Sequence, residues 1–218
     1  MAAEHGAHLG SDEPQPGTRR GPMHVSRIAI TVVLFAVSTG ASGATGQTSI
    51  ADQIDRALLA APETLREDAT VLGYGGDARA GDPLTVLRAG SNHVICLADD
   101  PARDGFHVAC YHDSLDPFMI IGRRIKADGG DRATILAARY AALEQGRIEA
   151  PAAALWSLTA SDDVDPGVAG STDGARRLAV VYVPGTESDA LGLPARPDGD
   201  SPWLMLPGTP WAHVMIPR

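Results

Sequence analysis

The residues best suited to catalysis or metal binding are four histidines in the part of the chain that is expected to fold. They are His93, His107, His112 and His213, and three of them stand near aromatic residues. Imidazole can act as a general base or as a metal ligand. His112-Asp113-Ser114 places three triad residue types in a row, but neighbours on a strand point apart, whereas triad members face one another. We therefore interpret this run as a strand end that leads into a helix cap.

Short catalytic signatures are missing from the sequence. It holds no G-x-S-x-G elbow, no H-E-x-x-H zinc motif, no phosphate-binding P-loop and no G-x-G-x-x-G fingerprint. These absences count against the common hydrolase and nucleotide-binding classes. A small hydrolase of an unfamiliar type that uses its histidines stays open as an alternative.

The segment Asp162-Asp163-Val164-Asp165-Pro166-Gly167 contains the pattern D-x-D-x-G, in which closely spaced carboxylates can bind Ca²⁺. An EF-hand loop needs a further ligand and a distal Glu, and Pro166 stiffens the middle of this segment. We interpret the segment as a solvated acidic turn. A Ca²⁺-dependent module is the alternative, and no metal is assigned.

Cys96 and Cys110 are the only cysteines in the sequence, and an even pair in an exported protein indicates a disulfide. Residues 93–98 and 106–112 are rich in β-branched and aromatic residues, and the segment between them is dense in turn residues. A hairpin centred on Arg103 therefore places the two cysteines opposite each other on one face.

A redox pair and a Zn²⁺ site with His107 or His112 are the alternatives to a structural disulfide. The spacing between the cysteines is not the C-x-x-C of redox proteins. Two His and two Cys could satisfy Zn²⁺, but His107 and Cys110 face opposite sides of a strand. The structural disulfide is the favoured interpretation.

The segment 203–216 is the most unusual part of the sequence. Pro207-Gly208-Thr209-Pro210 predicts a turn, which places Leu204 opposite His213 in a terminal hairpin. Both faces of this hairpin are apolar, so it is either buried centrally or open on one face to a ligand or partner. The tip of His213 could line a pocket with Trp211. The binding candidates are Trp211, His213, His112 and Tyr111.

Helical patterns occupy three stretches of the sequence. Ser49 begins a capping box for a helix over 49–61. Asp116 is the expected N-cap of a second helix, and Asp131 is that of a third. The remaining apolar patterns predict strands over 69–74, 83–88, 93–98, 106–112, 153–159, 178–183, 203–206 and 211–216.

These elements predict an α+β fold, because strands and helices do not alternate along the chain. We expect a mainly antiparallel sheet with two to three helices packed on one face and one hairpin disulfide. Residues 69–112 are predicted to form an antiparallel meander, with a tight turn at Gly90-Ser91.

Residues 23–46 show the three parts of a secretory signal peptide: a basic start, an apolar run over 28–37 and a string of small residues. The apolar run spans about 10 residues and a membrane helix needs about 20, so a permanent anchor is not favoured. Residues 1–22 are then a disordered extension or lie upstream of the true start. Residues 47–218 remain as a single globular domain, exported to the periplasm or secreted.

The net charge of the chain limits the classes of partner that it is expected to bind. The chain carries a net charge of −9. Nucleic acid and anionic lipid both require clustered cations, and no basic patch stands out beyond Arg123-Arg124-Lys126. We therefore predict no nucleic-acid partner, no cofactor and no stable membrane span after signal cleavage. An unknown small molecule or a protein of the cell envelope is the expected partner.

Two stretches carry a resemblance. Residues 106–112 (FHVACYH) with 115–119 (LDPFM) resemble a run in a group of uncharacterised exported bacterial proteins. Residues 202–213 (PWLMLPGTPWAH) are similar to a second run of that group. The likeness extends over most of the expected domain. No activity is attached to the group, so the resemblance implies export and transfers no functional residue.

Together these observations predict an exported, non-catalytic binding or interaction domain. The small exported hydrolase and the Ca²⁺- or Zn²⁺-dependent module stay as alternatives.

Overall fold

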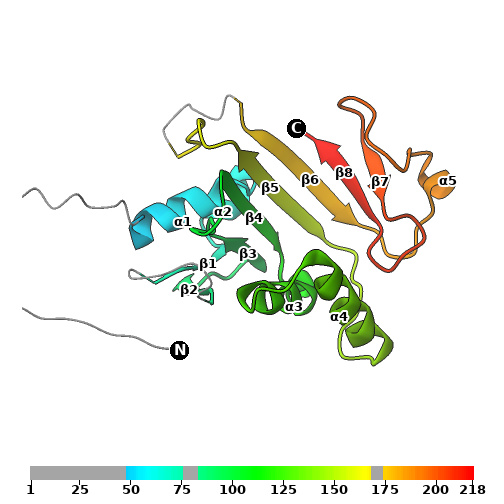
Figure 1. The fold of residues 1–218 in the computed structure, drawn as a ribbon. Helices are drawn as coiled ribbons and strands as arrows, with labels where there is room; N and C mark the ends of the chain where they lie inside the picture. The colour runs from blue at the N-terminus through cyan, green and yellow to red at the C-terminus, as the bar shows by residue number, and fades with distance from the viewer. Residues whose placement is uncertain (1–47, 76–82, 168–173) are drawn as a thin grey trace, which may run out of the picture. The chain divides into compact units, whose positions relative to one another are not determined.

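A computed structural model describes residues 48–75, 83–167 and 174–218. The predictions for residues 1–22 and 23–46 lie outside these ranges. The described residues form one mixed, mostly antiparallel sheet in the order β2-β1-β3-β4-β5-β6-β8-β7 (Figure 1). Its strands are β1 Thr70–Gly73, β2 Thr85–Arg88, β3 Val94–Leu97, β4 Phe106–His112, β5 Ala154–Ala160, β6 Arg176–Tyr182, β7 Trp203–Met205 and β8 His213–Pro217.

The helices are α1 Ile50–Leu58, α2 Glu63–Arg66, α3 Asp116–Ala127, α4 Arg132–Glu144 and α5 Ser188–Leu191, with the 3₁₀ turn η1 Asp113–Leu115. The predicted α+β class and the mainly antiparallel sheet are confirmed. The two four-residue helices α2 and α5 were not predicted, because so short a segment carries no apolar periodicity.

The hairpin of β3 and β4 holds the centre of the fold. Cys96 lies directly opposite Cys110, with Cα atoms 4.0 Å apart, and the two form a disulfide. Both side chains are fully buried. The predicted hairpin disulfide is therefore confirmed, and neither thiol is available as a zinc ligand or as a free redox group.

Helices cover both faces of the sheet. On one face, here the α1 face, Cys96, Val108 and Leu158 pack with Ala57 and Leu58 of α1. On the other, here the α3 face, residues of the opposite parity pack with α3 and α4: Ile95, Leu97, Tyr111, Leu155, Leu178, Val180 and Tyr182. Figure 1 shows the helices on their separate sides. The sequence analysis predicted that the helices pack on one face of the sheet. An apolar stripe predicts that a helix packs against the sheet, but it does not indicate which of the two apolar faces the helix covers.

Helix starts follow the local capping chemistry in two cases of three. Ser49 Oγ accepts a hydrogen bond from the backbone N–H of Asp52, and Asp131 accepts one from that of Thr134, as predicted. The third case is different, because η1 precedes α3 and Asp116 is the first helical residue rather than the N-cap. Its carboxylate is thereby free to pair with other side chains.

The first strands do not form the predicted meander. β1 lies between β2 and β3 and runs parallel to β3, so β2 is at the edge of the sheet. The tight turn expected at Gly90-Ser91 is wrong, because the chain there crosses β1. Gly90 donates to Thr70 Oγ1, and a Cβ at this position would stand 2.2 Å from the carbonyl oxygen of Asp68. Only glycine permits so close a crossing.

The terminal hairpin forms with a register one residue away from the prediction. Leu204 lies opposite Val214, and Met205 lies opposite His213. Two successive turns connect the strands over residues 206–212, and Leu206 adopts a left-handed φ of 56°. A one-residue slip exchanges the faces of a strand. His213 and Met205 therefore share the α3 face.

Candidate functional site

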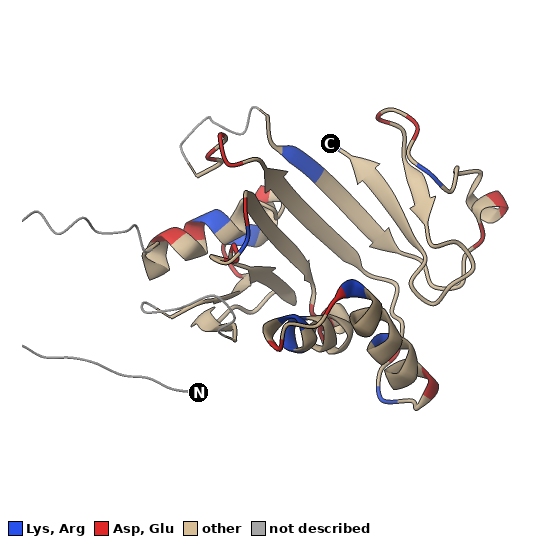
Figure 2. Cartoon of the chain, in the orientation of Figure 1, with Lys and Arg blue, Asp and Glu red and all other residues tan. Residues whose placement is uncertain are grey.

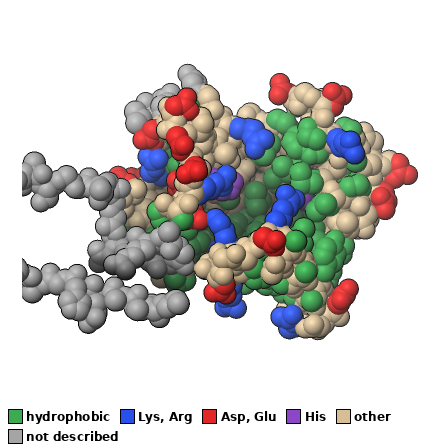
Figure 3. All heavy atoms as spheres, viewed as in Figure 1, with side chains coloured by type: hydrophobic (Ala, Val, Ile, Leu, Met, Phe, Trp, Pro, Cys, Tyr) green, Lys and Arg blue, Asp and Glu red, His purple; other side chains and the backbone are tan. Residues whose placement is uncertain are grey.

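A groove of about 1100 Å³ lies between the α3 face of the sheet and the helices α3 and α4. Figure 3 shows a hollow floored by hydrophobic side chains and bordered by Lys and Arg. A largely apolar concavity of this size is typical of small-molecule sites. Strand residues that share the α3 face supply much of the lining: Leu97, His107, Ala109, Tyr182, Met205 and His213.

Positive charge gathers around the groove, although the whole chain carries −9. The charged lining residues are six cations, Arg103, Arg123, Arg124, Lys126, Arg132 and Arg139, and two acids, Asp100 and Asp128. Figure 2 shows Lys and Arg on α3 and α4 together with some Asp and Glu, and further charged residues of both signs on α1 and on the loops. An excess of cations in a cleft raises the local concentration of negatively charged ligands.

Arg139 is the half-buried cation of the groove that has no carboxylate partner among the described residues. Its Nε donates to the carbonyl oxygen of Phe118 at 3.0 Å, and its Cζ lies 3.6 Å from the centroid of the Phe118 ring. Burial, and to a smaller extent the charge of Arg123, lowers the pKa of Arg139 to about 10. The guanidinium is thus charged at neutral pH and poorly compensated.

Gly122 of α3 makes room for this guanidinium. A Cβ at Gly122 would stand 2.6 Å from Nη2 of Arg139 and 3.4 Å from a methyl carbon of Ile135. Because the glycine is buried at the contact between α3 and α4, any larger residue would displace the arginine. The position of Arg139 is therefore set by the packing of the two helices.

Trp211 and His213, both predicted from the sequence, line the groove. The Trp211 ring is 2% exposed and lies 4.0 Å from the Phe118 ring, centroid to centroid. Its buried Nε1–H has no acceptor among the described residues. His213 Nδ1 lies 2.6 Å from the carbonyl oxygen of Trp211, so Nδ1 carries the proton and Nε2 is the open acceptor of the neutral ring. Burial lowers the pKa of His213.

His107 also lines the groove, although it was not among the predicted binding candidates. Its Nδ1 lies 2.9 Å from Thr159 Oγ1. Burial lowers the pKa of His107 to about 4, helped by the charges of Arg103, Lys126 and Arg176. His107 and His213 are consequently neutral at physiological pH, and neither ring contacts a carboxylate in the described structure.

Tyr111, the third predicted candidate, is a buried neighbour of the groove rather than part of its lining. Its hydroxyl donates to Asp116 at 2.8 Å and accepts from Arg123, which also pairs with Asp116 at 2.9 Å. Burial raises the pKa of Tyr111 well above its usual range. The network holds Arg123 at the edge of the groove, so Tyr111 contributes there only by positioning that arginine.

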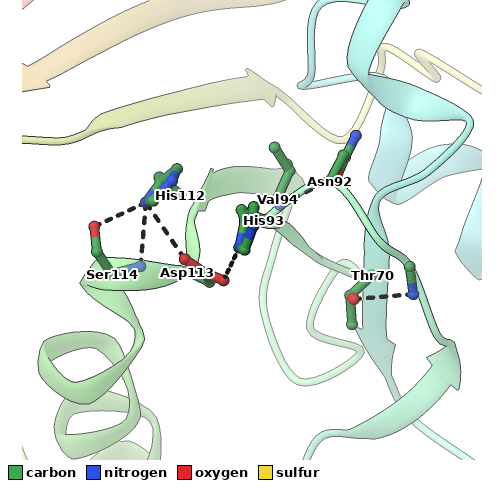
Figure 4. Close-up of polar contacts among 8 residues, drawn as sticks. Thr70, Asn92, His93, Val94, His112, Asp113 and Ser114 are labelled. Atoms are coloured by element: carbon green, nitrogen blue, oxygen red, sulfur yellow. Dashed lines mark hydrogen bonds and ion pairs between the residues drawn. The ribbon is translucent and has the colours of Figure 1, made fainter.

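His112, the fourth candidate, lies outside the groove and is exposed. Figure 4 shows it with Ser114, Asp113 and His93. His112 Nδ1 accepts from the backbone N–H of Ser114 at 3.2 Å and caps η1, and the Ser114 hydroxyl is 2.8 Å from the same nitrogen. Asp113 approaches that nitrogen at 3.4 Å and pairs with His93 at 2.8 Å. A catalytic relay needs the acid and the nucleophile on different ring nitrogens, so this cluster is a helix cap.

The acidic turn does not assemble a metal site. Asp162 accepts from the backbone of Gly105, Asp163 from the hydroxyl of Ser161, and Asp165 pairs with Arg56 at 2.6 Å. Among the described residues, no group of three or more His, Cys, Asp or Glu is placed to hold a metal ion. Nor is any helix in these ranges long and apolar enough to cross a membrane.

Comparisons with known proteins found no matching family model, no matching curated protein and no matching solved structure. The groove must therefore be interpreted from its own chemistry.

Arg139 is a groove residue that sequence reasoning missed, and His107 was considered there only as a possible catalytic residue or zinc ligand. Arg139 follows Leu136 by three residues and precedes Leu143 by four, so it belongs to the apolar stripe of α4. A cation on the inner face of a helix is the signal that could have drawn attention to it. His107 carries no comparable signal, because a lone histidine on a strand looks the same whether its face is covered or open.

Proposed function

We propose that this chain is an exported, non-catalytic binding protein that holds an amphipathic small molecule in the groove of the α3 face. The observation that carries the proposal is a groove of about 1100 Å³ with an apolar floor and an excess of cations in an otherwise acidic chain. Pockets of this kind obtain affinity from the apolar area and orientation from a few polar groups.

Export is supported by the buried disulfide and by the signal-peptide pattern of residues 23–46. Disulfides persist in oxidising compartments such as the periplasm and the cell exterior. A binding protein in such a compartment would meet its ligand outside the cytoplasm.

Binding is favoured over catalysis by the state of the groove histidines. A hydrolytic histidine needs a nucleophile on one ring nitrogen and an orienting group on the other. His213 contacts the carbonyl oxygen of Trp211 and His107 contacts Thr159, with no second partner for either ring among the described residues. The hydrolase alternative lacks the constellation that would carry it.

The test uses a substitution that fills the groove with a larger side chain. Ala109→Trp places an indole on the floor, and Val86→Trp adds the same side chain at an exposed position on the edge strand β2. The probe is 1-anilinonaphthalene-8-sulfonate, an anionic aromatic amphiphile, titrated by fluorescence and by calorimetry. We expect Ala109→Trp to weaken binding by about tenfold or more and Val86→Trp to leave it unchanged. Equal binding by both variants would place the probe elsewhere and overturn the proposal.

A further inference from the structure

We infer that the groove takes a long-chain monocarboxylate, with the carboxylate held by Arg139 and the hydrocarbon chain lying over the apolar floor. This inference rests on the proposed binding function and names its ligand class. It follows from one uncompensated cation and from the side-chain surface of the floor.

The charge of the head group follows from Arg139. Arg123 is neutralised by Asp116, and Lys126 by Asp100 at 2.6 Å. Arg139 has no such partner in the described structure. Its Nε donates to the carbonyl oxygen of Phe118, and its Nη2 lies 4.0 Å from the Met119 sulfur, which is a weak acceptor. Nη1 is therefore the terminal nitrogen without a hydrogen-bond partner among the described residues, and its N–H groups can donate to a carboxylate oxygen. A single half-buried cation favours a single negative charge.

A second unpartnered donor belongs to the same aromatic cluster. The Arg139 Cζ atom lies 3.6 Å from the centroid of the Phe118 ring, and the Phe118 and Trp211 ring centroids are 4.0 Å apart. The Nε1–H of Trp211 is buried and has no acceptor among the described residues. Because less than 1 Å² of this nitrogen is exposed, a ligand in the groove does not reach it, and the Arg139 guanidinium remains the donor that selects the head group.

The rest of the ligand must be apolar. The floor presents the side chains of a sheet face, including Leu97 and Ala109, and the backbone beneath them is already paired in the ladders. A bound peptide would bury backbone groups there without partners, at a cost that an alkyl chain avoids. Met119 and Met205 flank this surface, and methionine side chains adapt readily to a flexible chain.

The rim cations are weaker anchors than Arg139. Arg103, Arg124 and Arg132 are exposed, so water and salt screen their charges. A phosphate dianion would need several such cations together. The structure therefore favours the carboxylate at Arg139, and a head group held at the rim is the outcome that the experiment must be able to detect.

The experiment compares decanoate with decanol by isothermal titration calorimetry on the folded domain. The two molecules share a hydrocarbon chain and differ in the head group. We expect the wild-type chain to bind decanoate at least about tenfold more tightly than decanol, since a charge-assisted pair is worth that factor or more. This comparison needs no variant, so it holds whether or not substitutions are tolerated.

Variants then locate the head group. Arg139→Gln should weaken decanoate binding by about tenfold to a hundredfold and leave decanol binding unchanged. Gly122→Ala, which keeps the guanidinium but displaces it, should give a smaller loss for decanoate only. Arg196→Gln removes the same charge from an exposed loop outside the groove and should leave both affinities unchanged.

The outcomes separate the ligand class from the function. Equal binding of decanoate and decanol, or an equal loss in Arg132→Gln and Arg139→Gln, would overturn the carboxylate assignment and leave the binding function standing. Preference for dodecyl phosphate over dodecanoate would likewise overturn it in favour of a head group at the rim. If decanoate, decanol and the fluorescent amphiphile all fail to bind, the proposed function itself falls.

Discussion

Lowering the pH from about 7.5 to about 5 should destabilise this domain through His107. The pKa of His107 is lowered from 6.5 to about 4 by burial and by nearby arginine and lysine charges. Below pH 6.5 His107 becomes protonated in the unfolded chain, whereas in the folded chain it stays neutral until the pH approaches 4. The free energy of unfolding therefore decreases progressively as the pH falls through this window.

The size of the loss follows from the two pKa values. The complete shift corresponds to about 3 kcal/mol, reached only below pH 4. Between about pH 7.5 and pH 5 the linkage relation gives a loss of about 2 kcal/mol. Burial also lowers the pKa of His213, which adds to the wild-type loss in the same direction. The contribution of His107 to the pH dependence of the free energy of unfolding must consequently be measured as a difference between variants.

The assay is urea unfolding at the two pH values for the wild type and for His107→Gln. Glutamine keeps a polar contact within reach of Thr159 but does not titrate, so His107→Gln should lose about 2 kcal/mol less than the wild type across the window. Equal pH dependence in the wild type and His107→Gln would refute the reasoning.

Two further predictions concern the frame that holds the groove. Reduction of the Cys96–Cys110 bond, which joins residues 14 apart, should lower the free energy of unfolding by about 3 kcal/mol; an unfolding midpoint in urea unaffected by dithiothreitol would contradict this. Gly90→Ala should destabilise the domain by about 2 kcal/mol or more, because its Cβ would stand 2.2 Å from the backbone of Asp68. In the matched variant Gly75→Ala no described atom lies within 4 Å of the new Cβ, so the thermal midpoint should change little. Similar losses in both variants would argue against a steric cause at Gly90.

Local signals in the sequence were enough to predict the strands and the three longer helices. Turn residues between two strand-like segments predicted the hairpin and its disulfide, because both cysteines lie within that one hairpin. Ser49 and Asp131 predicted the starts of α1 and α4, because a cap depends on side chains three residues away. Each of these features is decided within about fifteen residues of chain.

The features that the sequence could not predict depend on distant contacts. The crossing at Gly90 exists only because β1 pairs with both β2 and β3. The register of the terminal hairpin was wrong, because Pro207-Gly208 suggested one turn where the chain makes two. That slip decides whether His213 shares a face with Met205 or with Leu204, and so it decides the composition of the groove floor.

The candidate site was predicted in part for the same reason. Trp211 and His213 stood out as a histidine and an aromatic residue in an apolar hairpin, and both line the groove. His112 and Tyr111 were chosen on residue type, and the structure gives them capping and positioning contacts instead. Arg139 becomes meaningful only when α4 is placed beside α3, since its isolation from carboxylates is a property of the folded chain.

The contrast between the acidic chain and its cationic groove also bears on how a ligand would be delivered. Charges on the surface act over about 8–10 Å at physiological salt, so a ligand near the groove experiences the charges close to it rather than the net charge of −9 of the whole chain. A single carboxylate amphiphile experiences mainly the local field of the groove, where cations outnumber acids. A carboxylate amphiphile is therefore attracted to the groove although the chain as a whole is acidic.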